Sequence, residues 1–338
     1  MSEIELHRRL LGDKVRNDAL AAALAKVVRP GVTVADIGAG SGFLSFLARR
    51  LGAEHCHLYE YGGALALARE LARRNGVTGL TFVHAHSAEV KKPPRVDVVI
   101  SETLGNYALE EGLLETLVDA RRFLKPGGVL VPAALTQFVA PVTSPRLQQE
   151  IDVFDRAAHG LDLAPAREVA LNNMYVKTVH GEELADPRQW DRLDFAASGK
   201  APSSVRKGEA RWGALKGATV HGFALWWQVE LVEGVVLSTS PMAAPTHWEQ
   251  VYLPLLEPVT LAAGQELDLS LTSDTRNGVR LAWETRVMAD GKPVSVQGQD
   301  LALSSSTRDG VRLVWETRVL DRGKPVSSQR QDLAKGRL

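Results

Sequence analysis

The amino-acid sequence predicts an α/β fold with a doubly wound parallel sheet, followed by an antiparallel β-barrel or sandwich domain with a helical arm. Three observations support this prediction. Strand-like and helix-like segments alternate up to about residue 132, which is typical of parallel sheets covered by helices. A glycine-rich loop directly follows the first predicted strand. Beyond Pro132, hydrophobic residues alternate in twos and turn residues are frequent, as in antiparallel sheets.

The N-terminal elements follow from hydrophobic spacing and from residues that begin or end helices. Residues 13–28 are rich in alanine and have helical spacing, and Asp13 is placed to cap this helix. A helix over 113–124 leads to a predicted turn at 125–128, which contains a proline and two glycines. The other expected elements are strands at 32–37, 55–59, 80–84, 96–100 and 129–131 and helices at 43–48 and 64–74.

The C-terminal part is expected to be antiparallel β structure with two additional features. Residues 148–170 look partly helical, and we expect an arm over about residues 145–180. The segment 275–302 recurs with most residues unchanged at 307–334, and each copy is typical of a hairpin around a Gly-Lys-Pro turn. An isolated hairpin is only marginally stable, so we expect the duplicated hairpin 275–334 to extend the β domain.

Length and composition limit the class of protein. The chain has 338 residues, and we expect two domains, at 1–132 and 133–338. Forty basic and forty acidic residues cancel, so no general affinity for nucleic acid or an anionic membrane is expected. The single Cys56 excludes an intrachain disulfide, and neither a signal pattern nor a membrane-spanning segment is evident. These features predict a cytoplasmic protein.

The glycine loop predicts a ligand at the carboxyl ends of the strands. Gly38, Gly40 and Gly42 lie between a strand and a helix, and glycine allows backbone to approach a ligand closely. Glu60 ends the second strand, where an acid can hydrogen-bond ribose hydroxyls. The spacing G-x-G-x-G differs from the dinucleotide pattern, which disfavours a nicotinamide-dependent oxidoreductase.

Two acids follow another predicted strand. Glu102 comes after the apolar run 96–100, and a turn at Gly105-Asn106 can bring Glu111 back toward it. Paired carboxylates repel each other unless a cation lies between them. A planar guanidinium is the best-matched cation because its N–H fork bonds carboxylates bidentately. The spacing alone favours a solvated polar loop, but the rest of the sequence reverses that preference.

Three separated motifs together resemble the protein arginine methyltransferase family: the glycine loop, the paired acids, and the loop Thr246-His247-Trp248. A lone histidine beside a tryptophan is more often packed than catalytic, so the combination carries the resemblance. The pattern Asp-x-Gly-x-Gly-x-Gly, which begins at Asp36, resembles the first motif of class I methyltransferases. The resemblance covers about residues 7–302.

This resemblance implies a fold, a cofactor, an activity and partners. The expected fold is a class I methyltransferase Rossmann-like sheet followed by the β domain. S-adenosylmethionine is the implied cofactor, and the implied activity is N-methylation of an arginine guanidinium in a protein or peptide. Residues 160–163 resemble the start of the family's dimerisation arm, which implies a homodimer. No metal, nucleic acid or membrane is expected to bind.

The resemblance also implies a role for each site residue. Glu102 and Glu111 would hold the guanidinium, and one of them, or His247 polarised by Asp13, would accept its proton. Arg16 lies in a stretch that resembles the helix closing over the cofactor, and it would pair with the methionyl carboxylate. The implied cofactor-binding residues are His7, Arg16, Asp36, Gly38, Gly40, Gly42, Glu60, Ser87 and Glu89.

Departures from the family pattern leave alternatives open. The family's aromatic N-terminal motif has no counterpart before His7, and Thr103 and Asn106 stand where bulky aromatic residues are common. Ala88 stands where an adenine-contacting acid is expected, with Glu89 one place away. A methyltransferase for a small guanidine, amine or hydroxyl metabolite is therefore one alternative. A catalytically inactive scaffold that binds partners through the β domain is another, although the intact acids and glycines argue against it.

Overall fold

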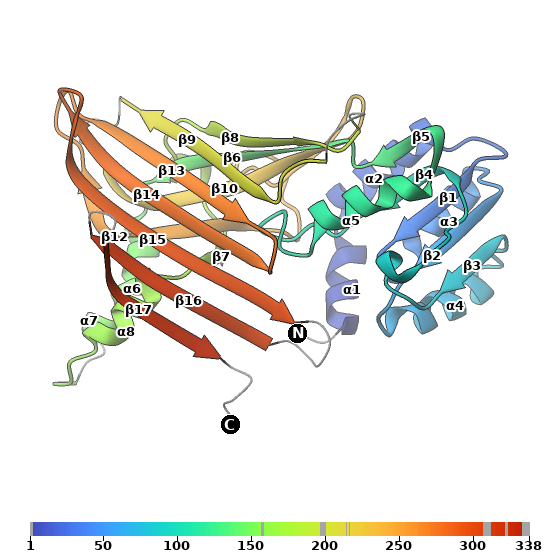
Figure 1. Ribbon diagram of the computed structural model, residues 1–338, viewed down its shortest axis with the longest axis horizontal. Helices are drawn as coiled ribbons and strands as arrows, with labels where there is room; N and C mark the ends of the chain where they lie inside the picture. Colours follow the sequence, from blue (N-terminus) through green and yellow to red (C-terminus); the bar gives the residue numbers. More distant parts are fainter. Residues whose placement is uncertain are drawn as a thin grey trace.

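The structure, a computed structural model, has a parallel α/β half and an antiparallel β half that lie side by side (Figure 1). None of the helices in its described parts is long and apolar enough to cross a membrane. The structure describes residues 3–156, 159–196, 201–213, 215, 217–306, 312–321 and 324–332.

The parallel half is a five-stranded sheet with the strand order β3-β2-β1-β4-β5. All of its pairings are parallel, which confirms the predicted doubly wound sheet. The strand order reverses between β1 and β4, and sheets of this kind bind ligands at that switch point. The elements are β1 (Thr33–Ile37), α3 (Phe43–Arg50), β2 (His55–Tyr59), α4 (Ala64–Arg74), β3 (Leu80–Val83), η1 (Ser87–Glu89), β4 (Val96–Ser101), α5 (Leu113–Ala120), η2 (Arg121–Phe123) and β5 (Leu124–Val131).

Two helices precede the sheet, α1 (Glu3–Gly12) and α2 (Lys14–Val27). The predicted cap is confirmed, because Asp13 Oδ1 accepts a hydrogen bond of 2.9 Å from the Arg16 backbone N–H at the start of α2. Helix α2 packs against α3 and also against β10 and β11 of the other half. It therefore lies at the junction between the two halves.

One predicted boundary is wrong. The helix expected to reach residue 124 ends earlier and continues as η2, and the turn expected at 125–128 lies inside β5. The pairing of β5 with β4 jumps between Leu124 and Val129, so the intervening residues form a bulge. Gly127 has a φ of +75°, which glycine adopts without strain. Glycine and proline mark bulges as well as turns, and only the pairing with β4 distinguishes the two.

The antiparallel half contains two sheets. One has the order β7-β12-β10-β6-β8 with β11 paired to β10, and the other has the order β17-β16-β15-β14-β13-β9. Strands β8 and β9 contact each other where the sheets meet. This arrangement confirms the predicted antiparallel β structure. The first strands are β6 (Ala134–Val142), β7 (Tyr175–Lys177), β8 (Arg188–Asp194), β9 (Val205–Trp212), β10 (Thr219–Val232), β11 (Val235–Ser238), β12 (Gln250–Thr260) and β13 (Glu266–Asp274).

Short helices connect β6 to β7 and largely coincide with the segment 148–170, where the sequence predicts partly helical structure. Figure 1 shows them at the end of the β half that lies away from the parallel sheet. A further short turn, η3, follows β7. These elements are α6 (Pro145–Ile151), α7 (Val153–Arg156), α8 (Ala164–Leu171) and η3 (Gly181–Glu183).

The two repeat copies form neighbouring hairpins in one sheet, β14 (Val279–Ala289) with β15 (Lys292–Ser306) and β16 (Arg312–Asp321) with β17 (Lys324–Asp332). Each hairpin has a register shift at the equivalent position. The second copy thus adds two strands beyond β15. The parts of that copy at 307–311, 322–323 and 333–334 lie outside the described residues.

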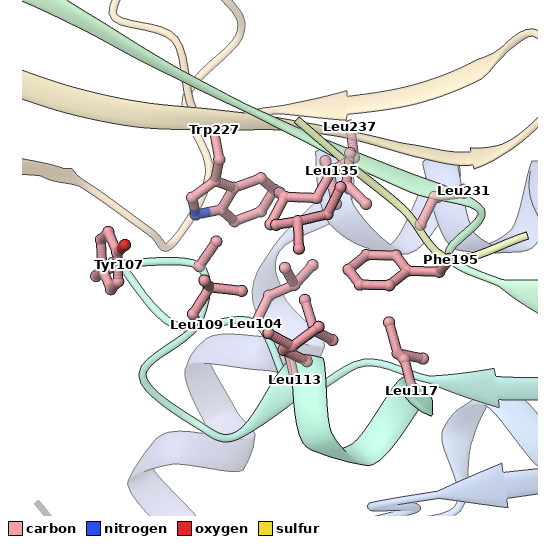
Figure 2. Close-up of a cluster of buried hydrophobic side chains, with 14 of the residues drawn as sticks. Leu104, Tyr107, Leu109, Leu113, Leu117, Leu135, Phe195, Trp227, Leu231 and Leu237 are labelled. Atoms are coloured by element: carbon pink, nitrogen blue, oxygen red, sulfur yellow. The ribbon is translucent and has the colours of Figure 1, made fainter. Parts of the chain in front are cut away.

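One buried hydrophobic cluster joins the two halves. Leu104 and Leu109, in the loop after β4, belong to it together with Leu113 at the start of α5. Leu135 of β6 and Trp227 of β10 reach the same cluster from the β half (Figure 2). The loop that carries the paired acids is therefore built into the core at the boundary between the halves.

Candidate active site

The glycine loop after β1 is covered closely by two side chains. Gly38 and Gly40 have φ angles of +71° and +51°. A Cβ on Gly38 would lie 2.9 Å from Thr103 Cγ2, and one on Gly40 would lie 2.8 Å from His7 Cε1. Gly42 also has a positive φ and is the N-cap residue directly before α3. The loop therefore requires glycine, and α1 covers it through His7.

Two acids lie near this loop: Glu60 bonds its backbone, and Asp36 lies in the strand before it. Glu60, directly after β2, accepts hydrogen bonds from the N–H groups of Gly40 at 2.9 Å and Gly62 at 2.6 Å. Asp36 of β1 is buried and accepts hydrogen bonds from the Ser45 hydroxyl at 2.7 Å and its N–H at 3.1 Å. Burial raises the pKa of Asp36 to about 6, against the lowering effect of the Ser45 bonds. Asp36 thus ties β1 to α3, whereas Glu60 lies beside the loop itself.

The remaining predicted cofactor residues lie in η1. Ser87 is buried, and its carbonyl accepts a hydrogen bond of 2.5 Å from Arg122. Ala88 and Glu89 are exposed. The structure therefore separates Ser87, which is packed inside this turn, from Glu89 at the surface.

Glu102 is bound to a guanidinium of the chain itself. Arg16 Nε donates to Glu102 Oε2 at 2.8 Å, and an outer nitrogen of Arg16 bonds the same oxygen. The side chains of Arg16 and Glu102 are only 8% and 6% exposed. Removing one member of such a pair leaves a buried charge without its partner, which is costly. Sequence reasoning did not predict this pair, and the role of Arg16 toward the cofactor carboxylate stays a prediction.

Glu111 lies in the same loop, with an exposed side chain. The pKa of Glu111 is nevertheless raised to about 7, because surrounding protein desolvates the carboxylate and because Glu102 and Glu110 repel its charge. Glu110 accepts a hydrogen bond of 2.9 Å from the Asn106 N–H, and burial raises the pKa of Glu110. The loop thus holds three neighbouring acids, one more than the sequence alone singles out. The only available signal for Glu110 was its position next to Glu111.

His247 and Asp13 meet although they are far apart in the sequence. Asp13 Oδ2 lies 2.7 Å from His247 Nδ1 and accepts a hydrogen bond of 2.8 Å from the His247 backbone N–H. Burial lowers the pKa of His247, although Asp13 and Glu102 act in the opposite direction. Burial alone would raise the pKa of Asp13, but hydrogen bonds from Arg16 and His247 lower it. Asp13 thus holds His247 in place, and the lowered pKa favours the neutral, proton-accepting imidazole.

Helix α1 connects these groups. His7 covers the glycine loop, and Arg9 on the same helix donates a hydrogen bond of 2.8 Å to the His247 carbonyl. Asp13 then binds His247 and caps the helix on which Arg16 reaches Glu102. These hydrogen-bonded residues therefore form one connected set that lies between the glycine loop (residues 38–42) and the loop with Glu102, Glu110 and Glu111 (residues 102–111, the acidic loop). Such a site can bind a nucleoside-type ligand beside a cationic group.

Both halves of the chain match known families. Residues 133–285 match the family model described as the arginine methyltransferase oligomerization subdomain, and residues 29–158 match a methyltransferase domain. Protein arginine N-methyltransferase 6 of Xenopus tropicalis is 30% identical over 287 residues, which cover 81% of this chain and 83% of that protein. The chain belongs to the protein arginine methyltransferase family. A probable protein arginine N-methyltransferase 6 of Arabidopsis thaliana is 26% identical over 318 residues, covering 80% of this chain and 73% of the relative.

Solved structures of this arginine methyltransferase family share the fold. The Trypanosoma brucei PRMT1 enzyme–prozyme heterotetrameric complex with AdoHcy has a TM-score of 0.77 at 24% identity, covering 87% of this chain and 96% of that chain. Arabidopsis thaliana protein arginine methyltransferase 10 has a TM-score of 0.74 at 22% identity, with the same coverage. The family resemblance drawn from the sequence motifs is therefore confirmed, and so is the predicted fold.

Proposed function

We propose that this chain is an S-adenosylmethionine-dependent N-methyltransferase acting on the guanidinium of arginine in a protein or peptide. The proposal rests on the charges of the acidic loop, which holds more carboxylates than the cations that pair with them. Glu102 has one guanidinium partner, whereas neither Glu110 nor Glu111 forms an ion pair within the described residues. A second guanidinium would supply the missing cation and favour the ionised form of Glu111. Glu102, paired with Arg16, already shows that this loop accepts the N–H groups of a guanidinium.

The residues around the glycine loop fit S-adenosylmethionine, the methyl donor that this activity requires. The glycine loop has no room for a Cβ at Gly38 or Gly40, and Glu60 keeps lone pairs for ribose hydroxyls beside it. The buried Thr103 hydroxyl also lacks a hydrogen-bond partner among the described residues. When bound, S-adenosylmethionine supplies a methyl group activated on a sulfonium. The residues beside the loop that would hold it are His7, Gly38, Gly40, Gly42 and Glu60. Roles for Arg16, Asp36, Ser87 and Glu89 stay predictions of the family resemblance, because the first three bond other groups of the chain and Glu89 is exposed.

The chain's own residues would bind the acceptor and take up its proton. Glu102 and Glu111 would hold the guanidinium fork and draw positive charge away from the attacking nitrogen. A guanidinium keeps its proton at neutral pH, so a nearby base must accept it during transfer. Glu111, whose pKa is about 7 before the acceptor binds, would accept this proton, and His247 held by Asp13 is the alternative.

Methyl transfer to a small guanidine, amine or hydroxyl metabolite is the second candidate. The observation that favours it is the presence of Thr103 and Asn106 where the family commonly has bulky aromatic residues. Incubation with methyl-labelled S-adenosylmethionine and either arginine peptides or a metabolite extract separates the two. We expect label in the peptides, recovered as methylarginine after hydrolysis. Label confined to metabolites would favour the second candidate, and an absence of label with a bound donor would indicate an inactive scaffold.

Glu60→Gln is expected to weaken binding of the donor. The amide cannot accept from Gly40 and Gly62 as the carboxylate does, and it loses the charge that strengthens bonds to hydroxyl groups. We expect affinity for S-adenosylhomocysteine to fall by about ten- to a hundredfold in titration calorimetry, which is typical of losing a hydrogen bond to a charged group. Glu54→Gln, at the opposite end of β2, should leave the affinity unchanged. Equal affinities for the two variants would contradict the assignment of Glu60.

We also propose a homodimer in which the arm of one protomer covers an apolar groove of its partner. The arm exposes Val153 and Leu161, whose exposed fractions are 42% and 68%. A groove of about 260 Å³ beside α3 and α4 has an apolar lining that includes Phe43, Phe46 and Leu71. Burying such surfaces against each other would remove apolar area from water. The match of residues 133–285 to an oligomerization subdomain supports this assembly.

Leu161→Asp is the test of this assembly. A carboxylate buried in the apolar groove would be strongly unfavourable, so we expect the variant to be monomeric in light scattering at concentrations where the wild type is dimeric. Val236→Asp places the same charge on β11, away from the arm, and should leave the dimer intact. A monomeric wild type, or a dimeric Leu161→Asp variant, would count against the proposed interface.

A further inference from the structure

Two indole N–H groups from the β half hold the backbone of the acidic loop. Trp227 Nε1 donates to the Gly105 carbonyl at 3.0 Å, and Trp248 Nε1 donates to the Leu104 carbonyl at 2.8 Å. Both bonds are buried, and the two indole rings meet edge to face with their centroids 5.0 Å apart. Two consecutive carbonyls between Glu102 and Glu111 are therefore bound by residues outside the loop.

Trp227 provides a rigid donor. Its side chain is 1% exposed, and its backbone exchanges hydrogen bonds with Thr239, with a Trp227 N to Thr239 Oγ1 distance of 3.1 Å and a Thr239 N to Trp227 O distance of 3.0 Å. Trp227 also pairs with Gln137 of β6 in the sheet. Figure 2 shows its indole against the loop that carries Leu104 and Leu109. The sheet thus fixes where the indole N–H points.

Gly105 occupies a crowded position in this loop. A Cβ on Gly105 would lie 2.1 Å from Glu110 Cγ, so the folded loop requires glycine, the residue with the least restricted backbone. The neighbouring Asn106 is held on both sides, because its N–H donates to Glu110 and its side-chain oxygen accepts a 3.0 Å bond from the Glu249 N–H. Without the Trp227 indole, the buried Gly105 carbonyl would have no hydrogen-bond donor among the described residues. Because an unpaired buried carbonyl costs free energy, we expect the loop to move.

We infer that Trp227 is a positioning residue for the methyl acceptor. By fixing Gly105 it sets the relative placement of Glu102 and Glu111, which lie on either side of Gly105 in the loop. This inference rests on the proposed function. Misplacing reacting groups by about 1 Å can cost about a hundredfold in rate, so a single bond to this loop is sufficient to matter. The effect should fall on the acceptor, because Trp227 contacts the acidic loop rather than the glycine loop.

Trp227→Phe tests the inference, because phenylalanine keeps an aromatic ring but has no N–H. Trp226→Phe is a matched control: Trp226 is the next residue of β10, is also buried, and stacks on Phe138 in a different hydrophobic cluster. For Trp227→Phe we expect kcat/KM for an arginine peptide to fall by about tenfold or more, with affinity for S-adenosylhomocysteine unchanged. The midpoint of its pH profile should also move, because the separations among the three acids change. Trp226→Phe should match the wild type in all three measurements.

Two results would overturn the inference: a Trp227→Phe variant with wild-type kcat/KM, or equal losses in both variants. If Trp227→Phe does not fold, benzothienylalanine at position 227 replaces the N–H with sulfur while preserving the ring shape, and the same loss is expected. Wild-type activity in that variant would also overturn the inference. Failure of the wild type to methylate any arginine peptide would contradict the proposed function instead.

Discussion

Glu102→Gln is expected to abolish methyl transfer while donor binding survives. The substitution keeps the shape of the side chain but removes the buried charge that would hold the acceptor guanidinium and now holds Arg16. Removing one group that stabilises charge in the transition state typically costs about a hundred- to a thousandfold in kcat, and we expect a loss of at least that size. Single-turnover transfer of labelled methyl to an arginine peptide measures the loss. Titration with S-adenosylhomocysteine measures donor binding in the same preparation.

The control for this prediction is an exposed acid. Glu70→Gln on α4 removes a carboxylate that forms surface ion pairs with Arg73 and Arg74, and such pairs contribute little. Its turnover should equal that of the wild type. Retained turnover in Glu102→Gln would contradict the assigned role. Parallel loss of donor binding would show that Glu102 acts mainly by holding Arg16 in place.

Activity toward the acceptor is expected to rise with pH through about pH 7. Glu111 has a pKa raised to about 7, so below that pH it is largely protonated and cannot hold a cation. We expect log kcat/KM to rise by about one for each pH unit below the midpoint and to level off above it, because this ratio reports groups of the free enzyme. Profiles of kcat/KM for an arginine peptide between pH 5 and pH 9 provide the measurement.

The source of this pKa can be tested with Glu110→Gln. Glu110 contributes a like charge near Glu111, so removing that charge makes ionisation of Glu111 easier. The midpoint should therefore move to lower pH, and activity should persist further into the acid range. An unchanged midpoint would indicate that Glu111 is not the titrating group. Glu111→Gln should remove this limb of the profile together with most of the activity.

The sequence predicted the parallel half well where the signals were local. The bounds expected for β2 and α4 agree with the structure because hydrophobic spacing determines them directly. Asp13 was also predictable, since a cap depends on residues one turn away. The bulge around Gly127 was not, because glycine and proline signals do not distinguish a turn from an irregular strand.

The candidate site depends mainly on contacts between residues far apart in the sequence, which local patterns do not predict. Asp13 and His247 are 234 positions apart, and only the family resemblance placed them together. The pair Arg16–Glu102 and the bond from Trp227 to Gly105 join residues 86 and 122 positions apart. Both depend on how the halves pack, and no local pattern marks either of them. Sequence reasoning could therefore propose residues for the site, but it could not predict the contacts that orient them.

The most direct test is a crystal structure of the protein with S-adenosylhomocysteine and an arginine peptide. The proposed function predicts that carboxylate oxygens of Glu102 and Glu111 both bond the peptide guanidinium, with its reacting nitrogen facing the donor sulfur and His247 nearby. A structure in which Glu111 turns to bulk water and the guanidinium binds elsewhere would contradict it.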